Sequence, residues 1–107
     1  MTRGVRLHPL ATAEVVEAQL WYEDRVAGLG DRFISSLRTV TTRAARWPDS
    51  GTPVRVDTDG RALERAVGLR GFPYVVVYRL HDNEVEVLAV HHERRRPMYW
   101  AGRAEGR

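Results

Sequence analysis

Two stretches of helical hydrophobic spacing, joined by a glycine turn, place the strongest constraint on the fold. In residues 10–27 the apolar side chains recur at intervals of three and four, which predicts an amphipathic helix. Residues 29–47 repeat this spacing, and Pro48 ends it. Because only a short turn at Gly28–Gly30 separates the two helices, they must form an antiparallel hairpin. The apolar positions of the pattern are Ala13, Val16, Leu20, Leu29, Phe33, Leu37, Val40, Ala44 and Trp47. We also expect Trp21 and Tyr22 in the core.

Short apolar or alternating runs flank this hairpin and predict strands. Residues 5–9 indicate a short edge strand, and residues 62–69, 72–80 and 84–92 indicate three more. Residues 49–61 are rich in Gly, Pro, Asp and Thr, and we expect a loop there. The order β-α-α-β-β-β predicts an α+β fold with the helical hairpin packed on a twisted, mostly antiparallel four-stranded sheet. A short basic C-terminal tail or helix completes this arrangement.

Length and composition narrow the class of protein further. With 107 residues the chain has room for a single domain, 1–107. It contains no cysteine, which excludes disulfides and thiolate metal sites. It shows neither a signal-peptide pattern nor an apolar run of the roughly 20 residues that a membrane span requires. We therefore expect a cytoplasmic protein without a membrane partner.

The positive charge is concentrated at one end of the chain. All 17 basic side chains are arginines. Residues 1–90 contain twelve arginines and twelve acidic residues, so they sum to zero, whereas residues 91–107 contain five arginines and two glutamates. The whole net charge of +3 thus follows the last strand. This local excess points to an anionic partner at the C-terminal end.

Three segments between His8 and Arg103 follow one another in a familiar order. They are HPLATAEVVEAQLWYEDRVAGLGDRF, RWP and FPYVVVYRLHDNEVEVLAVHHERRRPMYW. Together they resemble the RelE/ParE superfamily of toxins from bacterial type II toxin–antitoxin modules. The resemblance implies the same β-α-α-β-β-β architecture, growth inhibition and a link to plasmid stabilization. It also implies a cognate antitoxin that wraps and masks the toxin in a hetero-oligomer.

The resemblance leaves the target of the toxin open. ParE-like members of the superfamily poison DNA gyrase, whereas RelE-like members cut messenger RNA at the ribosome with basic and aromatic residues on the open sheet face. The chain lacks lysine, and therefore the paired sheet lysines of RelE-like members, which favours the ParE-like label. The alternatives are a ribosome-dependent messenger RNA endoribonuclease, a non-toxic nucleic-acid-binding module and a toxin that has lost its activity.

Candidate site residues follow from the chemistry of RNA cleavage, which needs a base, an acid and cations around a charged phosphate. The hypothetical catalytic set is His92, Arg65, Arg79, Arg95 and Tyr99. Further anion-binding candidates are Arg70, Arg94, Arg96 and Arg103. All of these predictions require that the side chains converge on the sheet face that the helical hairpin leaves bare.

Two further expectations concern partners and cofactors. Phe33 and Trp47 are the predicted antitoxin contacts, because a thin two-layer domain leaves part of its apolar surface uncovered. We expect no cofactor and no metal ion. His91 and His92 are adjacent on a strand, so their side chains point to opposite faces and cannot chelate one ion.

Overall fold

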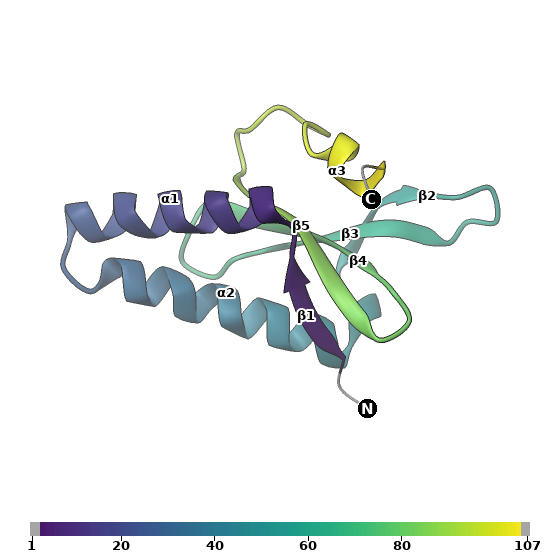
Figure 1. The fold of residues 1–107 in the computed structure, drawn as a ribbon, viewed down its shortest axis with the longest axis horizontal. Helices are drawn as coiled ribbons and strands as arrows, with labels where there is room; N and C mark the ends of the chain where they lie inside the picture. The colour runs from purple at the N-terminus through teal and green to yellow at the C-terminus, as the bar shows by residue number, and fades with distance from the viewer. Residues whose placement is uncertain (1–2, 106–107) are drawn as a thin grey trace.

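The computed structural model describes residues 3–105, in which two long helices cover one face of a sheet and a short helix lies on the other (Figure 1). The helices are α1 (Pro9–Arg25), α2 (Leu29–Arg46) and α3 (Ala101–Glu105), and a 3-10 turn, η1, spans Pro48–Ser50. The strands are β1 (Gly4–Leu7), β2 (Thr52–Val56), β3 (Ala62–Gly68), β4 (Tyr74–Leu80) and β5 (Glu84–His92). The predicted α+β class with a helical hairpin on a sheet is confirmed.

Within residues 3–105 the sheet contains five strands, in the order β1-β5-β4-β3-β2. β1 pairs parallel with β5, and the other neighbours are antiparallel. The prediction of four strands is wrong, because residues 52–56, expected in a loop, form β2. Pro53 and two register shifts hide the alternation of this strand. An edge strand tolerates both, since only one of its sides is paired.

Local hydrogen bonds fix the helical hairpin turn and the start of α1. Gly28 adopts a φ of 87°, a left-handed conformation that glycine reaches without a steric penalty. The Glu23 carboxylate accepts hydrogen bonds from the N–H groups of Gly28 at 2.8 Å and Gly30 at 2.9 Å. At the other end of α1, His8 Nδ1 accepts from the N–H of Leu10 at 3.1 Å. These contacts satisfy amide groups that a helix start leaves without partners.

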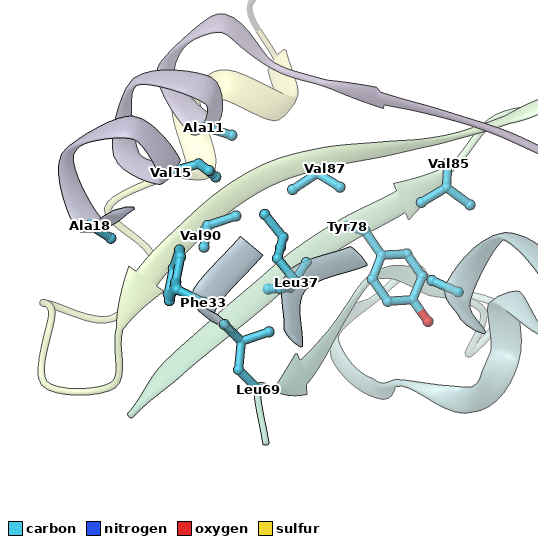
Figure 2. Close-up of a cluster of buried hydrophobic side chains, with 12 residues drawn as sticks. Ala11, Val15, Ala18, Phe33, Leu37, Leu69, Tyr78, Val85, Val87 and Val90 are labelled. Atoms are coloured by element: carbon cyan, nitrogen blue, oxygen red, sulfur yellow. The ribbon is translucent and has the colours of Figure 1, made fainter. Parts of the chain in front are cut away.

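The main core lies between the helical hairpin and the sheet (Figure 2). Phe33 and Leu37 of α2 and Val15 of α1 pack against the inward-facing residues of β4 and β5. The small side chains of Ala11 and Ala18 face the sheet and allow α1 to approach β5 closely. The fully buried residues of this cluster include Phe33, Val76, Tyr78, Val85, Val87 and Val90.

A buried tyrosine attaches η1 and the start of β2 to the core. The hydroxyl of Tyr78 donates to the carbonyl oxygen of Pro48 at 2.7 Å and accepts from the N–H of Gly51 at 3.1 Å. A Cβ atom at Gly51 would lie 2.7 Å from that hydroxyl oxygen, so this approach requires glycine. Arg65 completes the corner by donating to the carbonyl oxygens of Asp49 and Gly51, at 3.1 and 2.8 Å.

Candidate functional site

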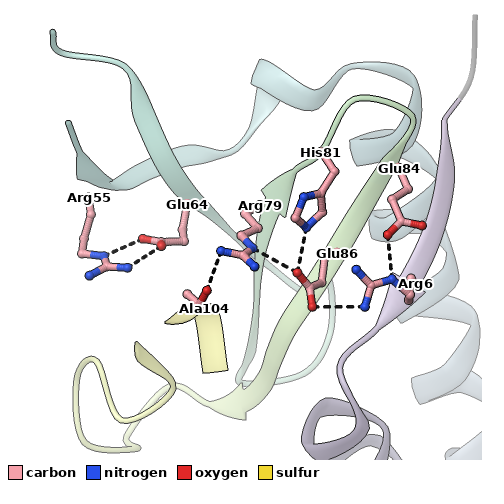
Figure 3. Close-up of polar contacts among 8 residues, drawn as sticks. All are labelled: Arg6, Arg55, Glu64, Arg79, His81, Glu84, Glu86 and Ala104. Carbon is pink, nitrogen blue, oxygen red and sulfur yellow. Dashed lines mark hydrogen bonds and ion pairs between the residues drawn. The ribbon is translucent and has the colours of Figure 1, made fainter. Parts of the chain in front are cut away.

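The sheet face opposite the helical hairpin, called the second face below, carries a row of ion pairs (Figure 3). At the β2–β3 edge the Arg55 guanidinium forms a two-point bond with the Glu64 carboxylate, at 2.7 and 2.6 Å. Glu64 is only 2% exposed. A buried carboxylate needs such a bidentate partner to offset its lost hydration.

A second buried carboxylate, Glu86 of β5, binds three cationic or titratable side chains (Figure 3). Its oxygens lie 3.0 Å from Arg79 Nε, 2.8 Å from His81 Nε2 and 3.3 Å from Arg6 Nη1. Burial by itself raises the pKa of Glu86, but the hydrogen bonds from His81 and Arg79 outweigh it and lower the pKa overall. The cations of this row are therefore neutralised by carboxylates, and the row is not an open basic surface.

Residues 93–105, called the C-terminal segment below, cover the second face. Trp100, which is 2% exposed, and Ala104 pack against Val77, Leu88 and Ala89 of β4 and β5. Met98 has a φ of 63°, a costly conformation for a residue with a Cβ atom. Arg79 Nη1 donates to the carbonyl oxygen of Ala104 at 2.7 Å. The sheet surface that the helical hairpin leaves bare is therefore occupied by the protein's own chain.

One carboxylate of α1 holds the C-terminal segment in place. Glu14 accepts from Tyr99 Oη at 2.6 Å and from both Arg103 Nη1 and Nη2 at 3.0 Å. It also accepts from the N–H of Val90 at 3.0 Å, and Arg103 donates to the carbonyl oxygen of Leu88 at 2.9 Å. β1 ends opposite Val87, so the edge of β5 beyond that point has no strand neighbour. Glu14 and Arg103 thus provide the hydrogen bonds that a longer β1 would have made.

These contacts change the acid–base properties of Glu14 and Tyr99. Burial acts to raise the pKa of Glu14, but the hydrogen bonds from Arg103, Tyr99 and Val90 lower it below its usual value. Burial and the hydrogen bond to Glu14 raise the pKa of Tyr99 well above that of a free phenol. The raised pKa makes Tyr99 a weaker acid than a free phenol, and its hydroxyl donates to Glu14.

The other predicted catalytic residues lie on different sides of the sheet. The His92 ring packs on Tyr74 at 5.5 Å between ring centroids, on the helix side, whereas the His91 ring lies 5.4 Å from Tyr99. The predicted alternation of the two histidines is correct. Arg65 pairs with Tyr78 across the β3–β4 ladder and so also lies on the helix side.

The structure does not bring the five predicted catalytic residues into one pocket. His92 and Arg65 lie on the helix side of the sheet, and Arg79 lies on the second face beneath the C-terminal segment. Arg95 is exposed, with its guanidinium 4.0 Å from the centre of the Tyr99 ring. The prediction of a common anion pocket is therefore wrong, because the strand alternation and the C-terminal segment separate these groups.

The predicted anion-binding arginines also separate. Arg94 and Arg96 are exposed in the C-terminal segment. Arg103 is bound to Glu14 and the backbone, so its charge is already compensated. Arg70 lies beside α2, where its carbonyl oxygen accepts from the Ser36 hydroxyl at 2.9 Å.

Of the two predicted antitoxin contacts, only one reaches the surface. Phe33 is fully buried in the main core and cannot contact a partner in this structure, whereas Trp47 is 57% exposed. Leu20 and Trp21 of α1, expected in the core, are instead 63% and 51% exposed. They line a groove of about 950 Å³ that reaches His92.

The described residues offer no cluster suited to a metal ion. Nowhere in residues 3–105 do three or more His, Asp or Glu side chains gather closely enough to bind one. None of the helices in this part of the chain combines the length and the apolar character that crossing a membrane requires.

The lowered pKa of Glu86 predicts how stability depends on pH. A carboxylate whose pKa is lower in the folded protein than in the unfolded chain stabilises the fold at pH values above its unfolded pKa, which is about 4.3 for glutamate. This stabilisation is lost as the pH falls through the folded-state pKa. We expect Glu86→Gln to reduce the free energy of unfolding near neutral pH and to flatten its decline in acid. Urea denaturation of both proteins between about pH 6 and pH 3 measures this. Parallel curves for the two proteins would contradict it.

Comparisons with known proteins agree on one family. A family model described as "ParE toxin of type II toxin-antitoxin system, parDE" matches residues 5–97. Toxin ParE2 of Mycobacterium tuberculosis, from strains CDC 1551 and H37Rv, is 31% identical over 98 residues, which cover 91% of this chain and 88% of the relative. A solved structure described as a chromosomal ParDE TA system from P. aeruginosa superimposes with a TM-score of 0.65 at 12% identity. That match covers 85% of this chain and 96% of the other, and it shows a shared fold.

Proposed function

The chain belongs to the ParE family of toxins from type II toxin–antitoxin systems, and we propose that it arrests growth by inhibiting DNA gyrase. A cognate antitoxin neutralises it in the cytoplasm by forming a hetero-oligomer. One observation carries the choice of gyrase over RNA cleavage. The second face, where cleavage residues were expected, is covered by the C-terminal segment and its cations are already paired.

The bonding of the candidate groups argues against an RNA-cleaving activity. A nuclease needs free cations for the phosphate and titratable groups that exchange protons with the substrate. Arg79 and Arg103 are instead bound to carboxylates and backbone carbonyls, and the hydroxyl of Tyr99 donates to Glu14. Inhibition of another enzyme requires a binding surface and no free catalytic groups.

The antitoxin is proposed to cover the exposed apolar side of α1. Val16, Leu20 and Trp21 are each about half exposed or more and lie on one helix, next to the groove that reaches Tyr74 and His92. Such a surface is typical of sites that accept an amphipathic helix or an extended segment. Trp47, at the end of α2, is a second contact in this proposal.

Expression in a bacterial host tests the proposal. The chain alone is expected to stop colony formation, and co-expression of the neighbouring antitoxin gene is expected to restore it. The purified chain is expected to inhibit supercoiling by gyrase, and plasmid from arrested cells should contain linear DNA from trapped cleavage complexes. Messenger RNA cut within translated codons, with supercoiling unaffected, would instead establish the nuclease alternative.

A single substitution separates the two mechanisms. We expect His92→Ala to keep its full growth arrest, because His92 is exposed on the helix side, whereas Arg79 and Arg103 lie at the second face. General acid–base catalysis contributes roughly 100- to 10,000-fold to a rate, so loss of His92 would abolish a nuclease that depended on it. Growth arrest is scored by colony counts after induction, with protein levels matched by immunoblot. Lost toxicity in a folded His92→Ala protein would contradict the gyrase assignment.

A further inference from the structure

The solvent side of α2 carries an arginine cluster that charge counting along the sequence does not reveal. Two adjoining hollows lie along this side, the first lined by Arg38, Arg43 and Arg46 and the second by Arg43 and Arg70. These four residues are called the α2 arginine face below. The other lining residues are mainly serines and threonines, and no carboxylate lines either hollow.

The charges of the α2 arginine face are uncompensated. Within residues 3–105, none of its four guanidinium groups forms an ion pair or a hydrogen bond with another residue. Arginines elsewhere, such as Arg55, Arg79 and Arg103, are bound to carboxylates. Residues 1–90 sum to zero charge, but α2 itself carries four arginines (Arg32, Arg38, Arg43 and Arg46) and one acid, Asp31, so this helix is positive.

The side chains on this surface suit phosphate oxygens. Arginine forks and Ser or Thr hydroxyl groups are the donors that most often contact the nucleic-acid backbone. Trp47 is the one large apolar side chain at these hollows that is strongly exposed. The core of a protein–protein interface, in contrast, is depleted in charge and rich in apolar side chains. The apolar side of α1 meets that description and the α2 arginine face does not.

The spacing of the arginines fits double-stranded DNA. Arg38 and Arg46 are eight residues apart on one helix, or about 12 Å along its axis at 1.5 Å per residue. The major groove of B-DNA is about 12 Å wide, so two arginines on α2 can reach phosphates on both of its edges. The opposite side of α2 carries Phe33, Leu37 and Ala44 in the core, which holds the helix rigidly for this contact.

We propose that the α2 arginine face binds the phosphate backbone of double-stranded DNA and so places the toxin on the DNA held by gyrase. The reference to gyrase rests on the proposed function, whereas the DNA contact itself rests on the arginine geometry alone. Binding is expected to be independent of base sequence and strongly salt-dependent, since it releases counterions from the duplex.

Fluorescence anisotropy with a labelled duplex of about 30 base pairs tests the proposal on the full chain. Four phosphate contacts predict a loss of roughly 100-fold in affinity between about 50 and 200 mM salt. Arg43→Gln with Arg46→Gln is expected to weaken binding and reduce that loss to roughly 10-fold. The matched control, Arg32→Gln with Arg61→Gln, removes the same charge from two exposed arginines outside the α2 arginine face and should leave the salt dependence unchanged.

Several results would overturn the proposal. Equal weakening of DNA binding in both double variants would mean that the affinity depends only on the net charge of the protein. Loss of binding in Arg94→Gln with Arg96→Gln, and not in the α2 variant, would move the site to the C-terminal segment. Tighter binding to poly-glutamate, to single-stranded DNA or to duplex RNA would mean a different partner. Circular dichroism of each variant verifies its fold.

A supercoiling assay separates this inference from the proposed function. DNA binding that depends on Arg43 and Arg46, in a protein that leaves gyrase active, would overturn the gyrase assignment and keep the DNA contact. If the variant Arg43→Gln with Arg46→Gln inhibits gyrase as strongly as the unchanged protein, the α2 arginine face does not place the toxin on the DNA held by gyrase. Supercoiling inhibition weakened by the α2 variant and not by the Arg32 and Arg61 control supports both.

Discussion

Replacing Glu14 by alanine is expected to lower the free energy of unfolding by about 3–5 kcal/mol. The change leaves the guanidinium of Arg103, which is 12% exposed at its side chain, without its carboxylate. It also removes the acceptor of the Tyr99 hydroxyl and of the Val90 N–H. A buried charge and two donors that have lost their acceptor make this the most damaging polar substitution we expect. Urea denaturation of the purified proteins measures the loss.

Two further variants test the explanation given for Glu14. Glu17→Ala removes an exposed carboxylate from the same helix and is expected to change stability by less than about 0.5 kcal/mol. The double variant Glu14→Leu with Arg103→Met removes both charges, and we expect it to recover the part of the loss that comes from the unpaired guanidinium, while the Tyr99 hydroxyl and the Val90 N–H still lack their acceptor. A loss below about 1 kcal/mol in Glu14→Ala would show that the carboxylate does not hold the C-terminal segment.

Replacing Phe33 by alanine is expected to destabilise the protein by about 3–5 kcal/mol, because it opens a cavity in the main core. The Phe33 ring packs between Tyr22, Phe72 and Tyr74, with ring centroids 5.5, 5.3 and 5.2 Å away. Thermal and urea denaturation measure the effect. Trp47→Ala is the matched aromatic control, and its exposed ring should cost less than about 1 kcal/mol. Similar losses in the two variants would contradict the burial of Phe33.

The helical hairpin and four of the five strands in residues 3–105 could be predicted from the sequence pattern, but the buried side of α1 could not. The larger side chains of Val16 and Leu20 suggested one side, whereas Ala11 and Ala18 face the sheet. Helical spacing identifies an apolar stripe but not which of two stripes is buried. Here the close approach of α1 to β5 selects small residues, and the larger ones remain at the surface. The same ambiguity produced the wrong expectation for Trp21.

The candidate site was less predictable, because charge composition does not show which charges are paired. Arg79 lies directly opposite Glu86 on adjacent strands, so this ion pair could be predicted from the register of the β4–β5 hairpin. The pair of Arg55 and Glu64 required β2, which Pro53 concealed. Glu14 and Arg103 are 89 residues apart, and no local pattern links positions so distant. Counting charges along the sequence therefore located the basic residues but did not show which of them lack a carboxylate partner.

The parallel pairing of β1 with β5 has a consequence for synthesis on the ribosome. β1 is made first and β5 last of the five strands in residues 3–105, so β1 stays unpaired in the growing polypeptide until β5 has emerged. The residues that clamp β5 at its open edge, Tyr99 and Arg103, emerge later still. A nascent chain thus cannot complete its sheet before β5 and these two residues have emerged. An antitoxin that recognises the completed hairpin and sheet would meet its target only after that point.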